Sequence, residues 1–405
     1  MNISYFISKR IVNAEKKSFS ATIHLVGVAS IALGLATMII SFLILVGFQN
    51  TIKEKAFSFS GHFQISRFTL NNSYEIDPIS MNRDFFTNYK DYEYVEHIQE
   101  YALKPGLLTK EDEVTGVVFK GIGESFELDR FEEYLVEGEF IQFRDSVDSK
   151  DVVISTEIAR QLKLKLNDEV IIFFVQNPPR FRKLKIRGIY ETGLEDFDQK
   201  VILGDIKLAR RLNNWPDSVA GGFEVFIKDV GKTKEAHSYL LNVTDRDLYV
   251  EDVSNLYFQI FDWLKLLDRN VVIFLSIILF VAGFNMISIV LILIMERTHM
   301  IGMLKALGAT NGTIRRIFVF NGGLLVLKGL VIGNLIAIGL GFIQYYFKLI
   351  PLDPVNYYME YVPIEWDWMM ILSLNLLTIV IIGLVLFIPV AMIARVRPIR
   401  AIRFD

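Results

Sequence analysis

The sequence predicts a multi-pass membrane protein that combines four transmembrane helices with a large α+β domain outside the membrane. Three observations indicate this fold class. First, the chain of 405 residues is 52% apolar, slightly more than an average soluble domain. Second, the stretches 18–52, 270–295 and 368–394 contain no Lys, Arg, Asp or Glu, and 317–347 contains only Lys328. Third, each stretch exceeds the roughly 20 helical residues needed to cross a hydrocarbon core about 30 Å thick.

These stretches divide the chain into membrane and aqueous segments. We expect transmembrane helices at 21–48, 268–295, 317–347 and 368–394, with one helix before the inserted domain and three after it. The aqueous segments are then 1–20, 49–267, 296–316, 348–367 and 395–405, and residues 268–405 would form a permease domain. The first apolar stretch is longer than the 7–15 residues typical of a signal-peptide core, so we expect it to remain as an anchor.

Basic residues are concentrated in the segments predicted on one side of the membrane. The tails 1–20 and 395–405 and the loop 296–316 are rich in Lys and Arg, whereas 348–367 contains only Lys348 among several carboxylates. The positive-inside rule therefore places both termini and 296–316 in the cytoplasm. The large segment 49–267 then lies outside.

The outer segment has the mixed pattern of an α+β domain. Alternating apolar positions predict strands at 117–120, 169–175, 183–190 and 224–227. Helical spacing is found at 155–164 and 206–213, and Ser155 is expected as the N-cap of the first of these helices.

The composition argues against several classes of function. The chain has no Cys, which excludes a lipidated Cys, thiolate metal sites and disulfides, and its net charge of −3 without a basic stripe argues against nucleic acid as a partner. The five His are scattered and form no metal motif. Gly231-Lys232-Thr233 ends like a phosphate-binding loop, but Phe226 occupies the position of the first glycine. We therefore expect no catalytic, cofactor-binding or metal site in this chain.

The loop 296–316 contains a short amphipathic helix. Ile301, Leu304, Leu307 and Gly308 recur at helical spacing, and Gly308 is placed where a C-terminal cap would end the helix. Such a helix could rest on the lipid surface or could fit its apolar stripe into a groove of a partner protein. The residues alone leave both possibilities open.

Glycines are frequent in the third apolar stretch. Gly329 and Gly333 form a Gly-x-x-x-Gly pair, which suits close contact between membrane helices, although glycine is common in such helices in any case. Lys328 is an ionisable residue in the same stretch. Three roles are open for Lys328: a function in the membrane, a side chain that extends to the membrane–water interface, or a hydrogen bond to a structural partner.

The segment Glu296-Arg-Thr-His-Met-Ile-Gly-Met-Leu-Lys-Ala-Leu-Gly-Ala-Thr310 resembles the coupling region of FtsX-type ABC permeases, a family that includes MacB and the LolC/LolE lipoprotein-releasing subunits. The similarity extends over almost the whole chain. Further matching motifs are Phe6-Ile-Ser-Lys-Arg10, Gly47-Phe48-Gln49, Gly61-His-Phe-Gln-Ile65, Ile154-Ser-Thr-Glu-Ile-Ala-Arg-Gln-Leu162, Gly188-Ile-Tyr-Glu-Thr-Gly193, Phe197-Asp198, Tyr357-Tyr358, Val362-Pro363 and Arg397-Pro-Ile-Arg-Ala-Ile-Arg403. Each motif is weak alone, but their order along the chain is specific.

The resemblance implies a function and a set of partners. A LolC/LolE-type permease extracts lipoproteins from the inner membrane of a Gram-negative bacterium and passes them to a periplasmic LolA-like carrier. It is driven by a separate LolD-like ATPase, which uses ATP and Mg, and it works with a second permease subunit, as a homodimer or a LolC/LolE heterodimer. Membrane lipids are further contacts. The alternatives are a MacB-like efflux permease for amphiphiles or peptides, and an FtsX-like regulator of cell-wall hydrolases.

The resemblance also implies three sites and leaves the LolC-like or LolE-like role open. The ATPase-coupling residues would be Glu296, Arg297, Ile301, Leu304, Lys305, Leu307 and Gly308. The carrier-binding hairpin would contain Pro178, Pro179, Arg180 and Phe181, unless this turn is a plain strand connection. The lipid-receiving cavity beside the first and second spans would include Ile40, Leu43 and Met286.

Overall fold

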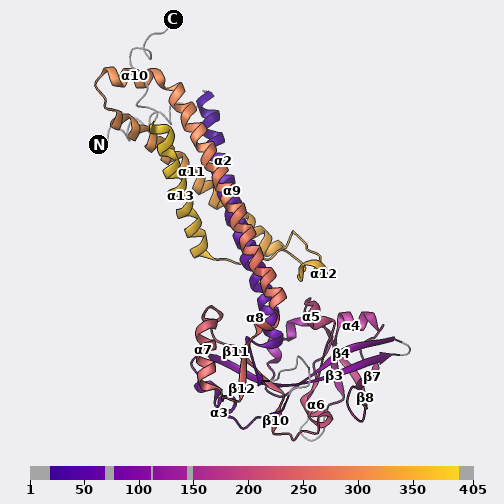
Figure 1. Cartoon of the computed structure of the whole chain (residues 1–405). Coiled ribbons are helices and arrows are strands. Elements are labelled where there is room, and N and C mark those ends of the chain that lie inside the picture. The colour runs from indigo at the N-terminus through magenta and orange to yellow at the C-terminus, as the bar shows by residue number, and fades with distance from the viewer. Residues whose placement is uncertain (1–18, 69–76, 111–112, 144–148, 392–405) are drawn as a thin grey trace. The chain divides into compact units, whose positions relative to one another are not determined.

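The computed structural model describes residues 19–68, 77–110, 113–143 and 149–391 (Figure 1). The Lys and Arg residues of the tails 1–20 and 395–405, on which the predicted orientation partly rests, lie outside the described residues. The chain splits into two compact units. The helical unit comprises Met1–Asn50, Trp263–Leu352 and Tyr361–Asp405, and the sheet unit comprises Thr51–Asp262 and Asp353–Glu360.

The described part of the helical unit contains long apolar helices. These are α2 (Phe19–Ser60), α9 (Phe258–Glu296), α11 (Asn311–Phe347) and α13 (Trp368–Ala391). The short α10 (Thr298–Ala306) lies between α9 and α11 in the chain. By length and composition, four helices of the described chain can cross a membrane. This confirms the prediction of four apolar helices.

Three of these helices run beyond the apolar stretches that predicted them, and one of the three is α11, which begins at Asn311, before the stretch 317–347. α2 continues to Ser60, and its last turns belong to the sheet unit, while α9 already begins at Phe258. The added turns carry charged residues that are compatible with a helix in water, so hydropathy alone does not mark where these helices end.

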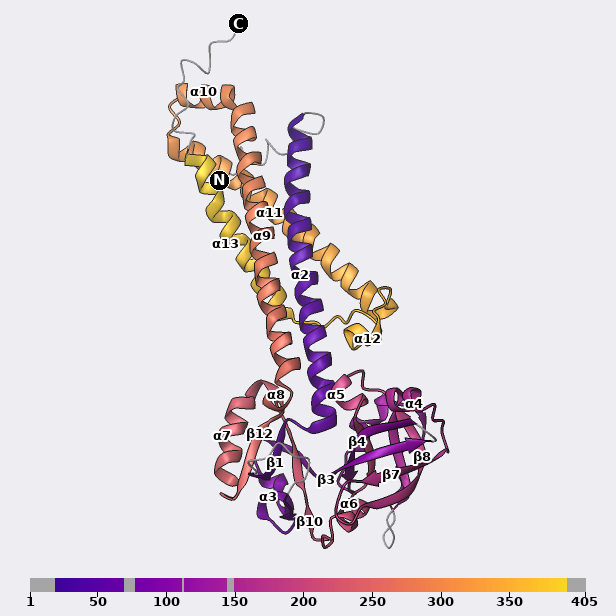
Figure 2. The ribbon, with the colours of Figure 1, turned by 45° about the vertical axis from the view of Figure 1, so that its right-hand side comes forward.

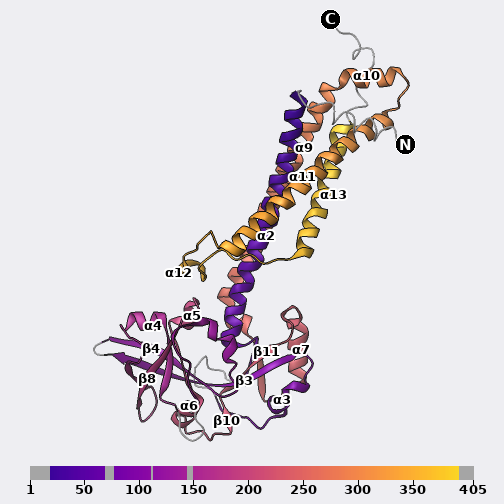
Figure 3. The same cartoon turned by 180° about the vertical axis from the view of Figure 1, so that it is seen from behind.

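Helices α11 and α13 pack against each other in the helical unit (Figure 3). Their contact includes a reciprocal pair of side-chain amides. Asn334 Nδ2 donates to Asn375 Oδ1 at 2.7 Å, and Asn375 Nδ2 donates back to Asn334 Oδ1 at 3.0 Å. Each amide also donates to a carbonyl of its own helix, so the pair is well satisfied inside an apolar bundle.

The sheet unit is built around a ten-stranded mixed sheet with the order β12-β1-β11-β3-β4-β9-β6-β8-β5, and β7 pairs with both β3 and β8. The strands of this sheet are β1 (Phe63–Arg67), β3 (Val95–Lys110), β4 (Glu113–Ile122), β5 (Leu135–Gly138), β6 (Asp151–Ser155), β7 (Glu169–Phe174), β8 (Arg180–Tyr190), β9 (Val201–Asp205), β11 (Gly222–Ile227) and β12 (Leu248–Asp252). A second, two-stranded sheet consists of β2 (Ile79–Ser80) and β10 (Val219–Ala220).

Short helices accompany the sheet. They are α3 (Asp84–Thr87), α4 (Thr156–Gln161), α5 (Glu195–Asp198), α6 (Ile206–Leu212), α7 (Thr233–Val243), α8 (Val253–Leu256) and α12 (Pro354–Tyr357). All of the strands and helices predicted for the outer segment are present. Ser155 caps α4 as expected, because its Oγ accepts a hydrogen bond of 3.0 Å from the backbone N–H of Ile158.

Two hydrophobic cores stabilise the sheet unit. One surrounds Phe119, Ile154 and Ile172 beneath α4 and α6, and the other surrounds Phe63 and Phe223 beneath α7. The long strand β3 contributes residues to both cores, which makes the unit one continuous α+β structure (Figure 1).

Candidate functional site

The loop between α9 and α11 contains the short helix that the sequence predicts. α10 lies between the ends of α9 and α11 (Figure 2). It ends in a Schellman motif, in which the N–H of Ala309 donates to Leu304 O at 2.9 Å and the N–H of Gly308 donates to Lys305 O at 3.0 Å. Gly308 has φ +88°, which favours glycine, so the predicted end of this helix is confirmed. Thr310 then caps α11 by accepting a hydrogen bond from the N–H of Thr313.

The apolar stripe of α10 is divided between two environments, which corrects the expectation that it faces one partner. Ile301 is fully buried in the core of this chain, and Leu304 is half-buried against the same core. Leu307, by contrast, is 86% exposed, and Met303 is exposed as well. The stripe splits because residues three apart on a helix diverge by about 60°, enough to move from the core side to the outer side.

The charged residues predicted to take part in ATPase coupling differ in exposure. Glu296 is exposed, whereas Arg297 and Lys305 are half-buried. The surface that a partner could contact is therefore smaller than the predicted set, and Leu307 is its most exposed apolar residue.

The predicted hairpin is formed by β7 and β8, whose antiparallel pairing ends with Phe174 opposite Arg180. Pro178 and Pro179 are exposed in the turn between the two strands. Arg180, one of the predicted carrier-binding residues, instead makes hydrogen bonds within this chain. Its guanidinium donates to the carbonyls of Arg211 and Leu212 at 3.1 and 3.3 Å, so Arg180 ties the hairpin to the end of α6.

Phe181 belongs to a row of exposed apolar side chains that crosses three strands. It is 62% exposed and stands opposite Phe173 of β7, with ring centroids 6.0 Å apart. Phe173 in turn stands opposite Leu107 of β3, and both are also exposed. The sequence analysis missed Leu107 and Phe173. The signal was present, because β7 is apolar on both faces although only one face is covered.

The lipid-cavity candidates lie in or beside the core of the helical unit. Leu43 and Met286 are each only 1% exposed, and Ile40 is partly buried against the same core. In this conformation Leu43 and Met286 are thus not accessible to a lipid chain, which corrects their assignment as lining residues. Other apolar side chains of α9 are accessible instead, among them Phe280, which is 73% exposed, and Phe284, which is 62% exposed.

Gly329 and Gly333 lie where α11 crosses α2. A β-carbon at Gly329 would be 2.7 Å from Cβ of Ile31, and one at Gly333 would be 2.8 Å from the carbonyl oxygen of Ala32. Both distances are too short for real atoms, so this crossing requires residues without a side chain. Lys328, next to Gly329, is exposed.

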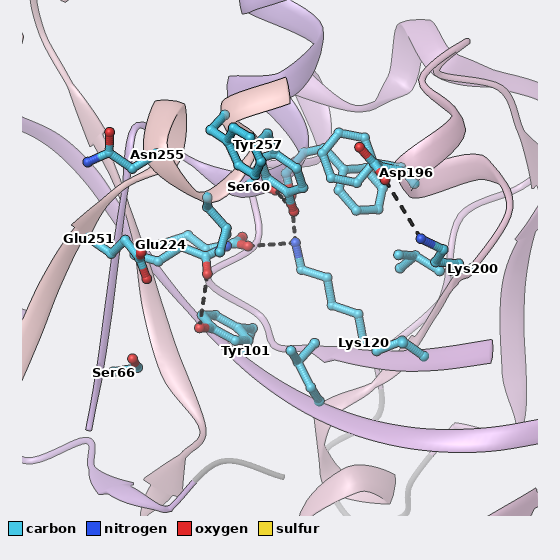
Figure 4. Close-up of a pocket in the computed structure, with 18 of the residues that line it drawn as sticks. Ser60, Ser66, Tyr101, Lys120, Asp196, Lys200, Glu224, Glu251, Asn255 and Tyr257 are labelled. Atoms are coloured by element: carbon cyan, nitrogen blue, oxygen red, sulfur yellow. Dashed lines mark hydrogen bonds and ion pairs between the residues drawn. The ribbon is translucent and has the colours of Figure 1, made fainter. Parts of the chain in front are cut away.

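The sheet unit contains a cavity of about 740 Å³ that includes a buried ion pair. Figure 4 shows Lys120 of β4 and Glu224 of β11 pointing toward each other, with Nζ and Oε1 2.7 Å apart. Lys120 also donates to the carbonyl of Phe59 at the end of α2, and Gln99 donates to the other oxygen of Glu224. The sequence analysis missed this pair. The signal was present in β11, where Glu224 is the single charge within an otherwise apolar strand.

The arrangement of Lys120 and Glu224 is structural rather than catalytic. The side chains of both residues are at most 5% exposed, and each oxygen of the carboxylate already has a donor. In the described part of the chain, no group of three or more His, Cys, Asp or Glu side chains could hold a metal ion.

Comparison with known families identifies both parts of the chain. Residues 26–240, more than half of the chain, match the MacB-like periplasmic core domain. Residues 272–398 match the FtsX-like permease C-terminal domain.

Curated relatives match over nearly their full length. The lipoprotein-releasing system transmembrane protein LolC of Neisseria meningitidis serogroup B is 24% identical over 394 residues, covering 90% of either chain. The protein LolE of the same kind of system in Haemophilus influenzae is 21% identical over 418 residues, covering 98% of either chain.

Among solved structures, the periplasmic region of MacB from Actinobacillus actinomycetemcomitans aligns with a TM-score of 0.35 and 15% identity, over 49% of this chain and 91% of that one. The match to the periplasmic core domain covers most of the sheet unit, and the match to the permease domain covers the apolar helices that follow it in the chain. The chain therefore belongs to the family with a MacB-like periplasmic core domain and carries an FtsX-like permease C-terminal domain, and it is similar to LolC and LolE over nearly its full length.

Proposed function

We propose that this chain is a permease subunit of an ABC transporter that extracts lipoproteins from the inner membrane and hands them to a periplasmic carrier. The observation that carries this proposal is the nearly full-length similarity to both LolC and LolE, which are named as parts of lipoprotein-releasing systems. The energy for release would come from a partner ATPase that uses ATP and Mg.

The proposed arrangement in the inner membrane has one span before the periplasmic domain and three spans after it. Both termini and the loop 296–316 lie in the cytoplasm, and the segments 49–267 and 348–367 lie in the periplasm. The distribution of Lys and Arg supports this orientation. Reporter fusions test it, with Thr310 expected inside and Asp353 outside. A further fusion site, Asp148, lies outside the described residues, and a cytoplasmic signal from it would contradict the arrangement.

The cytoplasmic partner would be a LolD-like ATPase, bound through α10. Its exposed apolar residues and its capped end support a helix that docks in a groove, because an isolated helix of nine residues is marginally stable. Glu296, Arg297 and Lys305 would surround this contact, and Gly308 would set its end. A second permease subunit, identical or LolC/LolE-related, would complete the pair.

The periplasmic partner would be a LolA-like carrier, bound by the hairpin of β7 and β8. The exposed row of Leu107, Phe173 and Phe181 supports this role, since aromatic side chains are enriched at binding hot spots. Phe181→Ala together with Pro179→Ala should weaken carrier capture and leave ATPase assembly intact. Leu241→Ala on α7, which is 54% exposed, is the matched control. Carrier capture that is unchanged by the double substitution would make the turn a plain strand connection.

The lipid chains of the substrate would enter beside α2 and α9. The stretches 18–52 and 270–295 of these helices contain no charged residue, which supports this path. The chain has no Cys, so single cysteines can be introduced for crosslinking. In the complex without ATP, cysteines at Ile40 and Phe280 should crosslink to lipoprotein. Leu43 and Met286 should react only if the helices separate, because they are now packed inside the core. Crosslinking confined to α13 would exclude this path.

The decisive experiment measures lipoprotein release. Depletion of the chain should leave outer-membrane lipoproteins in the inner membrane, and vesicles containing the permease and its ATPase should release lipoprotein to the carrier when ATP is added. Export of a dye or peptide without lipoprotein release would favour a MacB-like efflux permease. Normal lipoprotein sorting with impaired cell separation would favour an FtsX-like regulator.

A further inference from the structure

Lys55 joins three segments of the sheet unit that are distant in the sequence. It lies on α2 and is half-buried. Its Nζ donates to the backbone carbonyl of Thr192, directly after β8, and to the backbone carbonyl of Tyr358, directly after α12, at 2.7 Å each. A lysine ammonium has three N–H donors, so two of them are used to hold main-chain positions.

The turn that offers the Thr192 carbonyl is held in place by Asp198. This buried carboxylate accepts hydrogen bonds from the side-chain hydroxyl of Thr192 at 2.8 Å, from its backbone N–H at 3.2 Å and from the N–H of Gly193 at 2.8 Å. Burial raises the pKa of Asp198. The fixed turn presents its carbonyl without further rearrangement, as a preformed acceptor for Lys55.

Gly193 shows how closely the segment 353–360 approaches this turn. Its φ is +75°, and a β-carbon there would lie 3.2 Å from the carbonyl oxygen of Tyr358 and 3.3 Å from Nζ of Lys55. The backbone conformation therefore favours glycine, and a β-carbon there would crowd both neighbours.

Tyr358 carries backbone strain at the point of contact. It has φ +62°, in the left-handed region that non-glycine residues rarely adopt, and its N–H donates to the carbonyl of Pro354 at 2.9 Å to close α12. Such a conformation persists where the surrounding contacts hold it. The hydrogen bond from Lys55 to the Tyr358 carbonyl is a contact of that kind.

The segment 353–360 is part of the only connection between α11 and α13, and yet it belongs to the sheet unit. We propose that Lys55 is a positioning residue that clamps this connection to the sheet unit, so that movement of the C-terminal helices is passed to the periplasmic domain. This inference rests on the proposed transport function. It identifies the place where the connection is held.

The first experiment measures the clamp itself in the full complex. Lys55→Met keeps the length of the side chain but removes every donor, whereas Lys55→Arg keeps several. Lys53→Met is the matched control, because Lys53 lies on the same helix and makes neither of these contacts. We expect the amides of Tyr357 and Tyr358 to exchange hydrogen about tenfold faster in Lys55→Met than in the wild type, and at the wild-type rate in the other two variants. Equal exchange in Lys55→Met would overturn the clamp.

The second experiment measures coupling as lipoprotein released per ATP hydrolysed. Lys55→Met should assemble with its ATPase and hydrolyse ATP, but should release several-fold less lipoprotein per ATP, and Lys55→Arg should restore the ratio. An unchanged ratio in Lys55→Met would overturn the coupling role. If Lys55→Met does not assemble, Lys55→Ala, which also lacks a side-chain donor, is measured in its place, and normal exchange together with a normal ratio in that variant would have the same consequence.

The two experiments separate this inference from the function on which it rests. A wild-type complex that releases no lipoprotein contradicts the proposed function, while hydrogen exchange still decides whether the clamp exists. A wild-type complex that releases lipoprotein, with a Lys55→Met variant that does so equally well per ATP, contradicts the inference alone.

Discussion

Leu307 provides the sharpest test of the contact between the coupling segment and the ATPase. Its side chain is 86% exposed, so Leu307→Asp removes no packing within this chain. Leu304, three residues earlier on the same helix, is half-buried against the core, so an aspartate there would also affect folding. Leu307→Asp therefore changes the proposed interface and leaves the fold intact.

The expected effect follows from the area that docking would cover. Complete burial of a leucine side chain contributes about 1.5–3 kcal/mol. Since 1.4 kcal/mol corresponds to a factor of ten in the dissociation constant, the lost burial alone should weaken ATPase binding by about 10- to 150-fold. An aspartate without a partner in the apolar contact adds a desolvation cost in the same direction.

The assay is an equilibrium titration of the purified ATPase against the permease in lipid nanodiscs. Leu241→Asp is the matched control, because Leu241 is 54% exposed on α7 of the sheet unit and has no proposed contact with the ATPase. The control should bind like the wild type. Binding by Leu307→Asp within about threefold of the wild type would refute the reasoning and leave α10 as a membrane-surface helix.

Three further predictions concern folding and are measured by unfolding of the full chain in detergent. Lys120→Met leaves the buried carboxylate of Glu224 without its ion pair and should lower the free energy of unfolding by about 3–5 kcal/mol. The double variant with Glu224→Leu should recover part of this loss, and equal losses in the two variants would contradict a buried-charge penalty. Burial, followed by repulsion from Arg130, lowers the pKa of His62 to about 4, so the unfolded chain binds more protons below about pH 6.5. The free energy of unfolding should therefore fall by about 1.4 kcal/mol per pH unit from pH 6.5 down to about 4, and His62→Gln should lack this part of the slope. Asn334→Leu breaks the amide pair between α11 and α13 and should cost about 0.6–2 kcal/mol. Strict additivity with Asn375→Leu would show that the two amides are not coupled.

Much of the fold could be predicted from the sequence because it depends on local patterns. Four apolar stretches predicted four apolar helices, since a helix that crosses a bilayer needs an uninterrupted run of apolar residues. Alternation predicted strands such as β7 and β8, and a serine before a helical pattern predicted the cap at Ser155. Gly308 likewise indicated the end of α10, because a left-handed residue after a helix is most often glycine.

Parts of the candidate sites could not be predicted from the same patterns. Periodicity shows that Ile301 and Leu307 recur along one helix. It does not show that Ile301 is buried in the core of this chain while Leu307 is exposed to solvent. Arg180 was predicted as part of the carrier-binding hairpin, but its guanidinium is held by carbonyls at the end of α6, which no local pattern indicates.

The sequence by itself thus determined the number of apolar helices, the α+β character of the inserted domain and the family. Only the tertiary structure decided which side chains are accessible and which hold distant segments together. Lys120 binds the end of α2 to two strands, and Lys55 binds carbonyls 137 and 303 residues away. The physical reason is that hydropathy and caps act within a few residues along the chain. Burial and hydrogen bonding are set by neighbours that only folding brings together.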